Sequence, residues 1–167
     1  MRASRAYFLG LLACVMALVG CDHATKLAAA TALREHGPVV VVPGVVDLAY
    51  TENHDVAFDG LSRLSLHAPA AWLALLALSI TAATVVAWVR RRRAGWPVHA
   101  GFACIVAGAL GNALDRATRG HVVDFIHVHF WPVFNVADIL VVMGIAILLL
   151  SRRGARPGPR QSPCDVT

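Results

Sequence analysis

The sequence predicts an α-helical integral membrane protein, with four transmembrane helices and a small β-hairpin on the extracytoplasmic surface. Of its 167 residues, 57% are hydrophobic and only 15% are charged, and the mean hydropathy is +0.63. This composition leaves too little polar surface for a soluble domain. Four apolar runs and an uneven distribution of arginines between their connections predict several passes through a membrane.

The four apolar runs contain most of the hydrophobic residues. A transmembrane helix needs roughly 20 mostly apolar residues to cross the bilayer. The candidate helices cover residues 7–30, 67–89, 97–114 and 133–150. The last two are somewhat short, which indicates that polar residues at their ends continue the helices inside the fold. These residues are Asn112, Asp115, Arg116, Asn135 and Asp138.

The charged residues predict the orientation of the helices. Arginines lie near both ends of the chain and between the second and third runs: Arg2, Arg5, Arg90, Arg91, Arg92, Arg93, Arg152, Arg153, Arg156 and Arg160. Acidic residues lie in the other connections or at the helix ends that face them: Asp22, Glu35, Asp47, Glu52, Asp55, Asp59, Asp115, Asp124 and Asp138. Because positively charged loops stay in the cytoplasm, both termini are expected there. No aromatic residues are interleaved with the arginines, so we expect no nucleic-acid partner.

The two outer connections cover residues 31–66 and 115–132. The first holds two valine-rich runs separated by Pro43 and Gly44, which predicts a β-hairpin. The second alternates partly between polar and apolar residues, which predicts a strand or an interfacial helix. We expect residues 1–151 to form one domain and residues 152–167, rich in Arg, Pro and Gly, to be a disordered basic cytoplasmic tail.

The first apolar run has a second interpretation as a lipoprotein signal peptide. Two arginines precede it, and Leu18-Val19-Gly20-Cys21 is similar to a cleavage site at which Cys21 becomes the lipidated first residue. The helical pattern continues through Asp22 and Lys26 instead of changing to a flexible tether, which favours an uncleaved helix. The four cysteines of the chain show no paired spacing, so they are interpreted as packing residues.

Two aspartates at the margins of apolar segments are the candidate catalytic residues. Asp124 follows Val122 and Val123, and Asp138 lies in the fourth apolar run. A carboxylate beside hydrocarbon is costly and is by default a functional-site hypothesis. Two carboxyls that share one proton can activate water near neutral pH. A helix N-terminus alone would also explain Asp138, but it does not explain Asp124.

Polar residues at helical spacing extend this candidate site. Asp22 and Lys26 share a helix face and can form an ion pair, although Lys26 could instead extend outward to the membrane surface. Asn112 and Arg116 also share a face. Arg116 could pair with Asp115, or it could bind a carboxylate or a lipid headgroup.

Two asparagines and three histidines complete the candidate residues. Asn135 lies three residues before Asp138, so the two side chains point the same way, and Asn53 offers a donor and an acceptor on a loop after the hairpin. His127 and His129 would share a face of a strand, and His121 or Asp124 could complete a zinc site. The spacing matches no strong zinc pattern, so no metal is predicted.

These motifs, in this order, resemble those of the lipoprotein signal peptidases (signal peptidase II), the four-helix aspartyl peptidases of bacterial inner membranes. The matching stretches are Asp22-x-x-Thr25-Lys26, Asn53 with Ala57-Phe58, Gly111-Asn112-x-x-Asp115-Arg116, Val122-Val123-Asp124-Phe125 and Phe134-Asn135-x-Ala137-Asp138. One departure is Asp55, which stands where the family usually has a flexible glycine.

The resemblance implies an aspartic endopeptidase of the inner membrane, with its site near the outer face. It implies that Asp124 and Asp138 are the catalytic pair. It also implies that the substrate-binding residues are Asp22, Lys26, Asn53, Asn112, Arg116 and Asn135. The implied substrates are diacylglyceryl-modified prolipoproteins, cleaved before the lipidated cysteine. Membrane lipids are the other expected partners, no cofactor is implied, and a monomer is expected. The alternatives are a non-enzymatic membrane lipoprotein or structural bundle, and a proton-coupled carrier.

Overall fold

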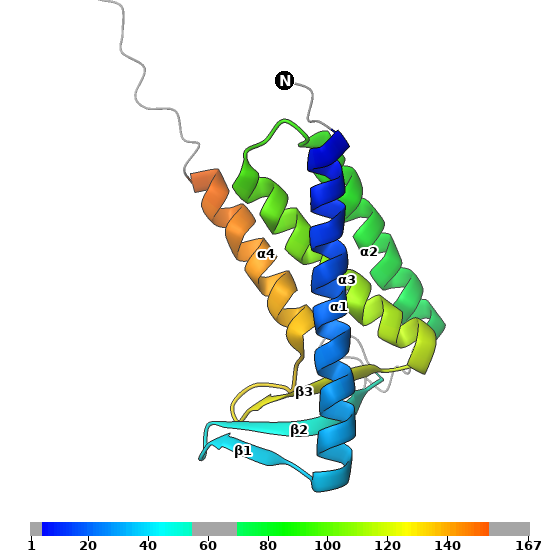
Figure 1. Ribbon diagram of the computed structural model, residues 1–167, viewed down its shortest axis with the longest axis vertical. Coiled ribbons are helices and arrows are strands. Elements are labelled where there is room, and N and C mark those ends of the chain that lie inside the picture. The colour runs from blue at the N-terminus through cyan, green and yellow to red at the C-terminus, as the bar shows by residue number, and fades with distance from the viewer. Residues whose placement is uncertain (1–4, 55–69, 154–167) are drawn as a thin grey trace, which may run out of the picture.

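Four helices and one small sheet make up the part of the chain that the computed structural model describes, residues 5–54 and 70–153. The sheet lies at the end of the helices opposite the N-terminus (Figure 1). In chain order the elements are α1 (Arg5–His36), β1 (Val39–Val42), β2 (Val46–Asn53), α2 (Ala70–Arg90), α3 (Trp96–Arg119), β3 (Val122–Val128) and α4 (Val136–Arg153).

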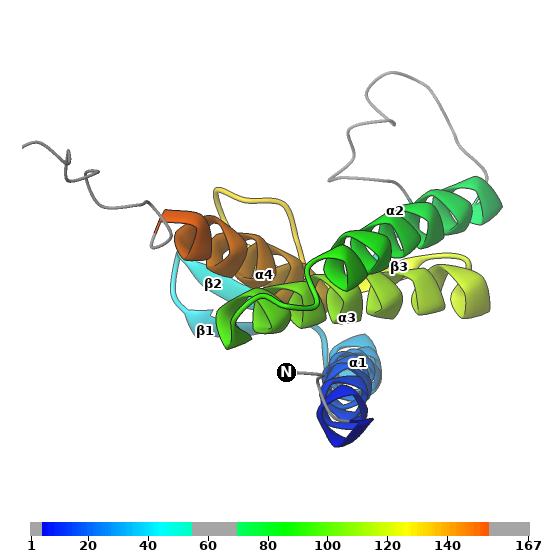
Figure 2. The same cartoon turned by 90° about the horizontal axis from the view of Figure 1, so that it is seen from above.

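Helix α3 is the centre of the bundle and packs against each of the other three helices. Figure 2 shows it between α1 and α2. The buried core of the bundle joins α1, α3 and α4 through Val15, Ala103, Val106, Ala107 and Leu140. The residues of α3 that follow this core therefore lie close to both α1 and the start of α4, where the candidate site is expected.

Glycines allow α3 and α4 to approach closely. A Cβ atom at Gly108 would come within 3.0 Å of the backbone oxygen of Ala137 and of the Val141 side chain. Small residues at such contacts are typical of helix packing in membranes, where close van der Waals contact replaces the hydrophobic effect. This contact holds the first turn of α4 against the middle of α3.

Large apolar side chains cover the outward faces of the helices. They include Phe8, Leu9, Leu12 and Met16 of α1, Trp72, Leu75, Leu76 and Ile80 of α2, and Val142, Ile145, Leu149 and Leu150 of α4. Soluble proteins rarely expose apolar patches of this extent. Within the described residues, two helices are long and apolar enough to cross a membrane, Ala6–His36 and Trp96–Arg119. The four predicted helices are thus present, while their number of membrane crossings stays a prediction.

The sheet is antiparallel with strand order β1-β2-β3. The predicted hairpin is confirmed, and its turn contains Gly44 at a φ of 72°, a conformation that glycine adopts easily. The second outer connection forms a strand, β3, so its alternation was a strand pattern. The far half of α1 packs on this sheet through Ala29 and Leu33, which contact Phe125 of β3.

Several predicted boundaries were wrong by a few residues. Helix α1 runs to His36 instead of residue 30, and α3 runs to Arg119 instead of residue 114. Each ends at a glycine with a φ of 78°, Gly37 and Gly120, whose N–H donates back to the carbonyl four residues earlier. Such glycine caps end helices irrespective of hydropathy. The helix ends that were predicted from the apolar runs were therefore placed too early.

Two further predictions are affected by the observed boundaries. Asn53 is the last residue of β2 and not a loop residue, and α4 includes residues 152 and 153, which were expected in the tail. The rest of the expected tail, residues 154–167, lies outside the described residues. So do Asp55, Ala57 and Phe58, and with them the departure from the family pattern. Cys21 lies within the continuous helix α1.

Candidate active site

The two candidate catalytic aspartates come from neighbouring elements at the end of the bundle that meets the sheet. Asp124 is the third residue of β3, and Asp138 lies in the first turn of α4. The segment between these elements folds back on the strand, because Phe134 pairs with Ile126 in an isolated β-bridge. This return brings the start of α4 beside β3.

Asn135 connects the two carboxylates directly. Its side-chain Nδ2 donates to Asp124 Oδ1 at 2.6 Å, and its backbone N–H donates to Asp138 Oδ2 at 3.1 Å. In return, the backbone N–H of Asp138 donates to Asn135 Oδ1 at 3.1 Å. Asn135 is fully buried, so its side chain holds the two acids in a fixed relation. The predicted i, i+3 relation of Asn135 and Asp138 is thereby observed.

Asp124 is buried, with 3% of its surface exposed. Asn53 Nδ2 donates to its second oxygen, Oδ2, at 2.9 Å. Burial raises the pKa of Asp124 to about 6, because a buried charge loses its hydration. The hydrogen bonds from Asn53 and Asn135 oppose this rise, and the nearby charge of Asp138 adds to it. The carboxyl therefore titrates close to neutral pH, where it can exchange a proton with water.

Asn112 of α3 supports the other carboxylate. Its Nδ2 donates to Asp138 Oδ1 at 2.9 Å. Its Oδ1 accepts from Lys26 Nζ at 2.9 Å and from Asn135 Nδ2 at 3.1 Å. With two donors on its oxygen, the amide is held in one orientation, with its nitrogen facing Asp138. Asn112 thus connects the carboxylate pair to a charged cluster between α1 and α3.

That charged cluster consists of Asp22, Lys26 and Asp115. Lys26 is fully buried, and its Nζ lies 2.8 Å from Asp22 Oδ2 and 2.9 Å from Asp115 Oδ2. The predicted pair of Asp22 and Lys26 is observed, and the alternative in which Lys26 extends outward is wrong. Buried charges of this kind are tolerated only when they are paired.

Asp115 was not predicted to be a site residue. A pairing with Asp115 was one of the two alternatives considered for Arg116. The observed ion-pair partners of Asp115 include Lys26 and Arg119, the latter at 3.4 Å. The signal was available in the sequence, because Asp115 lies three residues after Asn112 and so shares its helix face. Arg116 is half-buried, donates to the Asn112 carbonyl at 3.4 Å and interacts electrostatically with Asp124 and Asp138.

Asp22 also positions the start of α4. Its Oδ1 accepts a hydrogen bond of 2.8 Å from the backbone N–H of Ala137. This N–H belongs to the first turn of the helix, whose donors have no partner within the helix itself. The contact is possible because residue 111 is glycine, where a Cβ would lie 2.5 Å from Asp22 Oδ2. Helices α1, α3 and α4 are thus joined at one point next to Asp138.

Two depressions lead to the carboxylates. A polar one reaches Asp124 between β2, β3 and the segment before α4; it is lined by Thr51, Glu52, Asn53, Asp124, His127, Trp131, Pro132 and Val133. An apolar one reaches Asp138 along α4; it is lined by Val128, Phe130, Trp131, Phe134, Asp138, Ile139, Val142 and Met143. The acids therefore lie where a polar surface meets an apolar groove.

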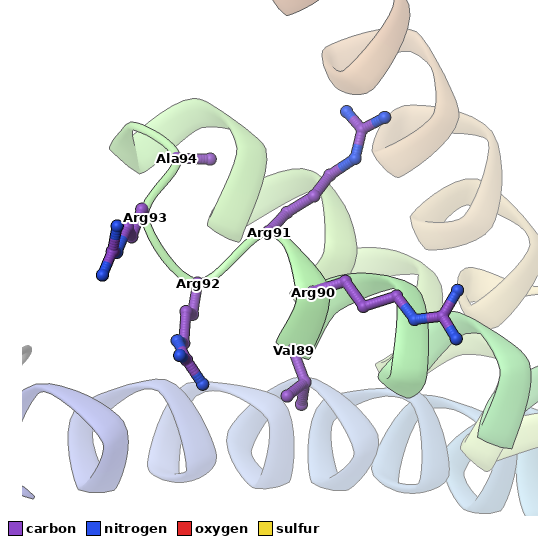
Figure 3. A pocket seen from close by; sticks show the side chains of 6 residues that line it. All are labelled: Val89, Arg90, Arg91, Arg92, Arg93 and Ala94. Carbon is purple, nitrogen blue, oxygen red and sulfur yellow. The ribbon is translucent and has the colours of Figure 1, made fainter.

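A further hollow lies at the turn between α2 and α3 and is unrelated to the carboxylates. It is lined by Val89, Ala94 and the arginines at positions 90–93. Figure 3 shows these arginine side chains extending in different directions from the turn. They do not converge on a common point, so this hollow offers positive charge but no arranged binding groups.

The zinc site considered for the histidines around Asp124 is not formed. His121 lies with Glu52 and His54, whereas His127 and His129 lie with Asp47. Asp124 instead faces the two asparagines. The reason is the alternation of side chains along a strand, which directs positions 127 and 129 to one face and position 124 to the other.

Comparisons with known proteins agree with the motif pattern. The sequence profile of the family described as Signal peptidase (SPase) II matches residues 14–152. A lipoprotein signal peptidase of Allorhizobium ampelinum is 38% identical over 141 residues, which cover 81% of this chain and 83% of the relative. Another, of Xylella fastidiosa, is 36% identical over 151 residues and covers 87% and 89%. A solved structure described as a bacterial membrane enzyme superimposes with a TM-score of 0.75 at 22% identity, covering 91% of this chain and 94% of that one.

Proposed function

This chain belongs to the signal peptidase II family, and we propose that it hydrolyses its substrates with a pair of aspartates, Asp124 and Asp138. Membership of the family makes it a membrane protease of lipoprotein processing, which removes signal peptides from prolipoproteins. The aspartic mechanism and the assignment of the two residues are the proposed part.

The observation that carries the proposal is the hydrogen bonding of Asn135 to both carboxylates. One buried side chain with its own backbone N–H holds Asp124 and Asp138 in a fixed geometry. Such preorganisation is what a water-activating pair requires, because no rearrangement is then needed at the moment of reaction. A surface aspartate and a simple helix-capping aspartate would not need a common buried partner.

In the proposed reaction the pair holds one proton. The ionised carboxylate takes a proton from a water molecule as the water oxygen attacks the scissile carbonyl. The protonated carboxyl donates to the carbonyl oxygen. On collapse of the tetrahedral intermediate, the carboxyl that took the proton from water donates it to the leaving amine. The other carboxylate regains a proton from a hydroxyl of the intermediate as the new carbonyl forms, which restores the starting state. A pKa of about 6 for Asp124 supports this exchange near neutral pH.

The substrate is proposed to be a prolipoprotein that carries a diacylglyceryl-modified cysteine, cleaved just before that cysteine. The polar depression at Asp124 suits the peptide backbone, and the apolar groove at Asp138 suits acyl chains. Asn53 and Asn112 hold one carboxylate each, and Arg116 supplies positive charge beside both. Asp22 and Lys26 act through Asn112 and the first turn of α4, so they position the pair without touching the substrate.

We further propose that the protein is a monomer in the bacterial inner membrane, crossed by all four helices, with both termini in the cytoplasm. The arginine-rich turn after α2 and the N-terminus lie at one end of the bundle, and the sheet and the carboxylates lie at the other (Figure 1). This separation supports an outer location of the site under the positive-inside rule. We propose one domain over residues 1–151.

The test is cleavage of a lipidated prolipoprotein by the purified protein in detergent. Asp124→Asn and Asp138→Asn are each expected to abolish cleavage, while a metal chelator leaves it active. Glu35→Gln removes an exposed carboxylate of α1 and is the matched control. Full activity in either aspartate variant would refute the assignment of the pair.

A further inference from the structure

We propose that Asp47, His127 and His129 form a binding site for a divalent transition-metal ion on the sheet, separate from the carboxylate pair. The three residues offer one carboxylate oxygen and two imidazole nitrogens, and these atoms all lie within 4.8 Å of one another. Asp47 and His129 have no role in the proposed hydrolysis, and His127 only lines the edge of the polar depression at Asp124. The proposal concerns binding of the ion and does not depend on the catalytic assignment.

The strand geometry brings the three ligands together. His127 and His129 lie two residues apart on β3, so their side chains point to the same face, and their rings stack with centroids 5.1 Å apart. Asp47 of β2 is the register partner of His127. Its Oδ2 lies 2.6 Å from His129 Nε2 and 3.9 Å from His127 Nδ1. One carboxylate oxygen is therefore shared by two imidazoles.

The distances require only small side-chain movements to bind an ion. In a tetrahedral zinc site with bonds of about 2.0–2.1 Å, neighbouring ligand atoms lie about 3.4 Å apart. The pair of Asp47 and His127 would close slightly and that of Asp47 and His129 would open slightly, through side-chain rotation. Asp47 and both histidines are partly exposed, with 20%, 37% and 42% of their side chains accessible. An ion can thus reach them and keep water in its remaining positions.

The ligand chemistry favours zinc and its neighbours over magnesium or calcium. Two nitrogens and one carboxylate oxygen suit Zn²⁺, Co²⁺, Ni²⁺ or Cu²⁺, whereas the hard cations prefer oxygen ligands alone. Among the described residues, the Asp47 carboxylate forms ion pairs only with these two histidines. It is therefore available to a metal without breaking a bond to arginine or lysine.

A second group on the sheet, Glu52, His54 and His121, is a weaker candidate for the same chemistry. Its carboxylate is already engaged, because Glu52 Oε1 accepts hydrogen bonds from Arg34 and from the Tyr50 hydroxyl at 2.9 Å. These bonds hold the pKa of Glu52 below its ordinary value. A metal would have to displace a cation from Glu52, which makes this group the natural internal control.

The experiment is calorimetric titration of Zn²⁺ into the full chain, purified in detergent without a polyhistidine tag and freed of metal. One ion per chain is expected, and His129→Ala and Asp47→Asn should each weaken binding at least tenfold, which is about 1.4 kcal/mol. His54→Ala removes a ligand of the second group, and His36→Ala removes an exposed histidine at the end of α1. Both are expected to bind zinc as the unchanged chain does.

Cobalt supplies a spectroscopic test of the ligands. Co²⁺ bound by imidazole nitrogens should give visible d–d absorption. This absorption should disappear when Zn²⁺ displaces the Co²⁺, and it should be absent in His129→Ala. If His129→Ala does not fold, as judged by thermal unfolding, His127→Gln takes its place. Unchanged zinc affinity in the ligand variants would overturn the proposal. Loss of binding in His54→Ala alone would also overturn it and assign the ion to the second group.

Discussion

Replacing Asp124 by asparagine is expected to abolish cleavage and, at the same time, to stabilise the folded protein at neutral pH. The carboxyl is 3% exposed, and its pKa of about 6 lies well above the ordinary value of 3.8. This difference corresponds to about 3 kcal/mol of disfavoured ionisation in the folded state. Asparagine has nearly the same shape and no charge, so this cost disappears in the variant.

The expected gain is smaller than the full cost, because the amide provides one acceptor instead of two. Asn53 and Asn135 both donate to Asp124, so one of these hydrogen bonds is lost at about 1 kcal/mol. The net stabilisation is then about 2 kcal/mol at pH 7.5. For a chain of this size it corresponds to a rise of about 4–8 °C in the unfolding temperature.

The gain should depend on pH with a definite sign. A carboxyl whose pKa is raised in the folded state contributes its full stability below the unfolded pKa, and that contribution is lost as the pH rises through about 6. At pH 4.5 only about 1 kcal/mol of the cost has developed, which cancels against the lost hydrogen bond. The two proteins should therefore unfold at nearly the same temperature at pH 4.5.

Thermal unfolding in detergent at pH 4.5 and pH 7.5, followed by tryptophan fluorescence, measures this difference. Glu35→Gln, which removes an exposed carboxylate, should change neither stability nor cleavage. The reasoning would be refuted if Asp124→Asn and the unchanged chain differed in unfolding temperature by the same amount at both pH values. A variant that is less stable than the unchanged chain at pH 7.5 would also refute it.

Three other substitutions test the remaining contacts. Asp138→Asn should abolish cleavage of a lipidated prolipoprotein with the helical content retained, measured by peptide release and circular dichroism; measurable turnover would contradict its role. Lys26→Met should destabilise the fold by about 3–5 kcal/mol, because it leaves buried carboxylates without their cation, and an unchanged unfolding temperature would contradict the observed cluster. Gly111→Ala should lower cleavage strongly, because its Cβ would lie 2.5 Å from Asp22 Oδ2. Gly10→Ala, with nothing within 4 Å of the added carbon, should leave cleavage unchanged.

Much of the fold follows from local sequence patterns. Hydropathy predicted the four helices, and the split valine runs predicted the β1-β2 hairpin. What hydropathy did not predict is where α1 and α3 end, since Gly37 and Gly120 set these ends by their left-handed conformation. The sequence did not distinguish a strand from a helix at β3, because the alternation of polar and apolar residues there is incomplete and the pairing with β2 is a long-range contact.

Apart from Asp115, the residues that meet at the candidate site were predicted from the sequence, whereas the contacts between different elements were not. Asp22 with Lys26 and Asn135 with Asp138 are neighbours at helical spacing, and both relations are observed. The contact of Lys26 with Asp115 joins residues of different helices, so no local spacing could reveal it. The zinc site that was considered around Asp124 and not adopted shows the opposite case: His127 and His129 are close to Asp124 in the sequence, but alternation along the strand directs them to its other face.

The buried position of Lys26 has a practical consequence for chemical labelling. It is the only lysine in the chain, and in the fold it is completely inaccessible. Amine-directed crosslinkers, fluorophores and acylating reagents therefore find no lysine side chain on the native protein. Modification of Lys26 requires separation of α1 from α3, so the rate of its acylation measures how often these helices come apart.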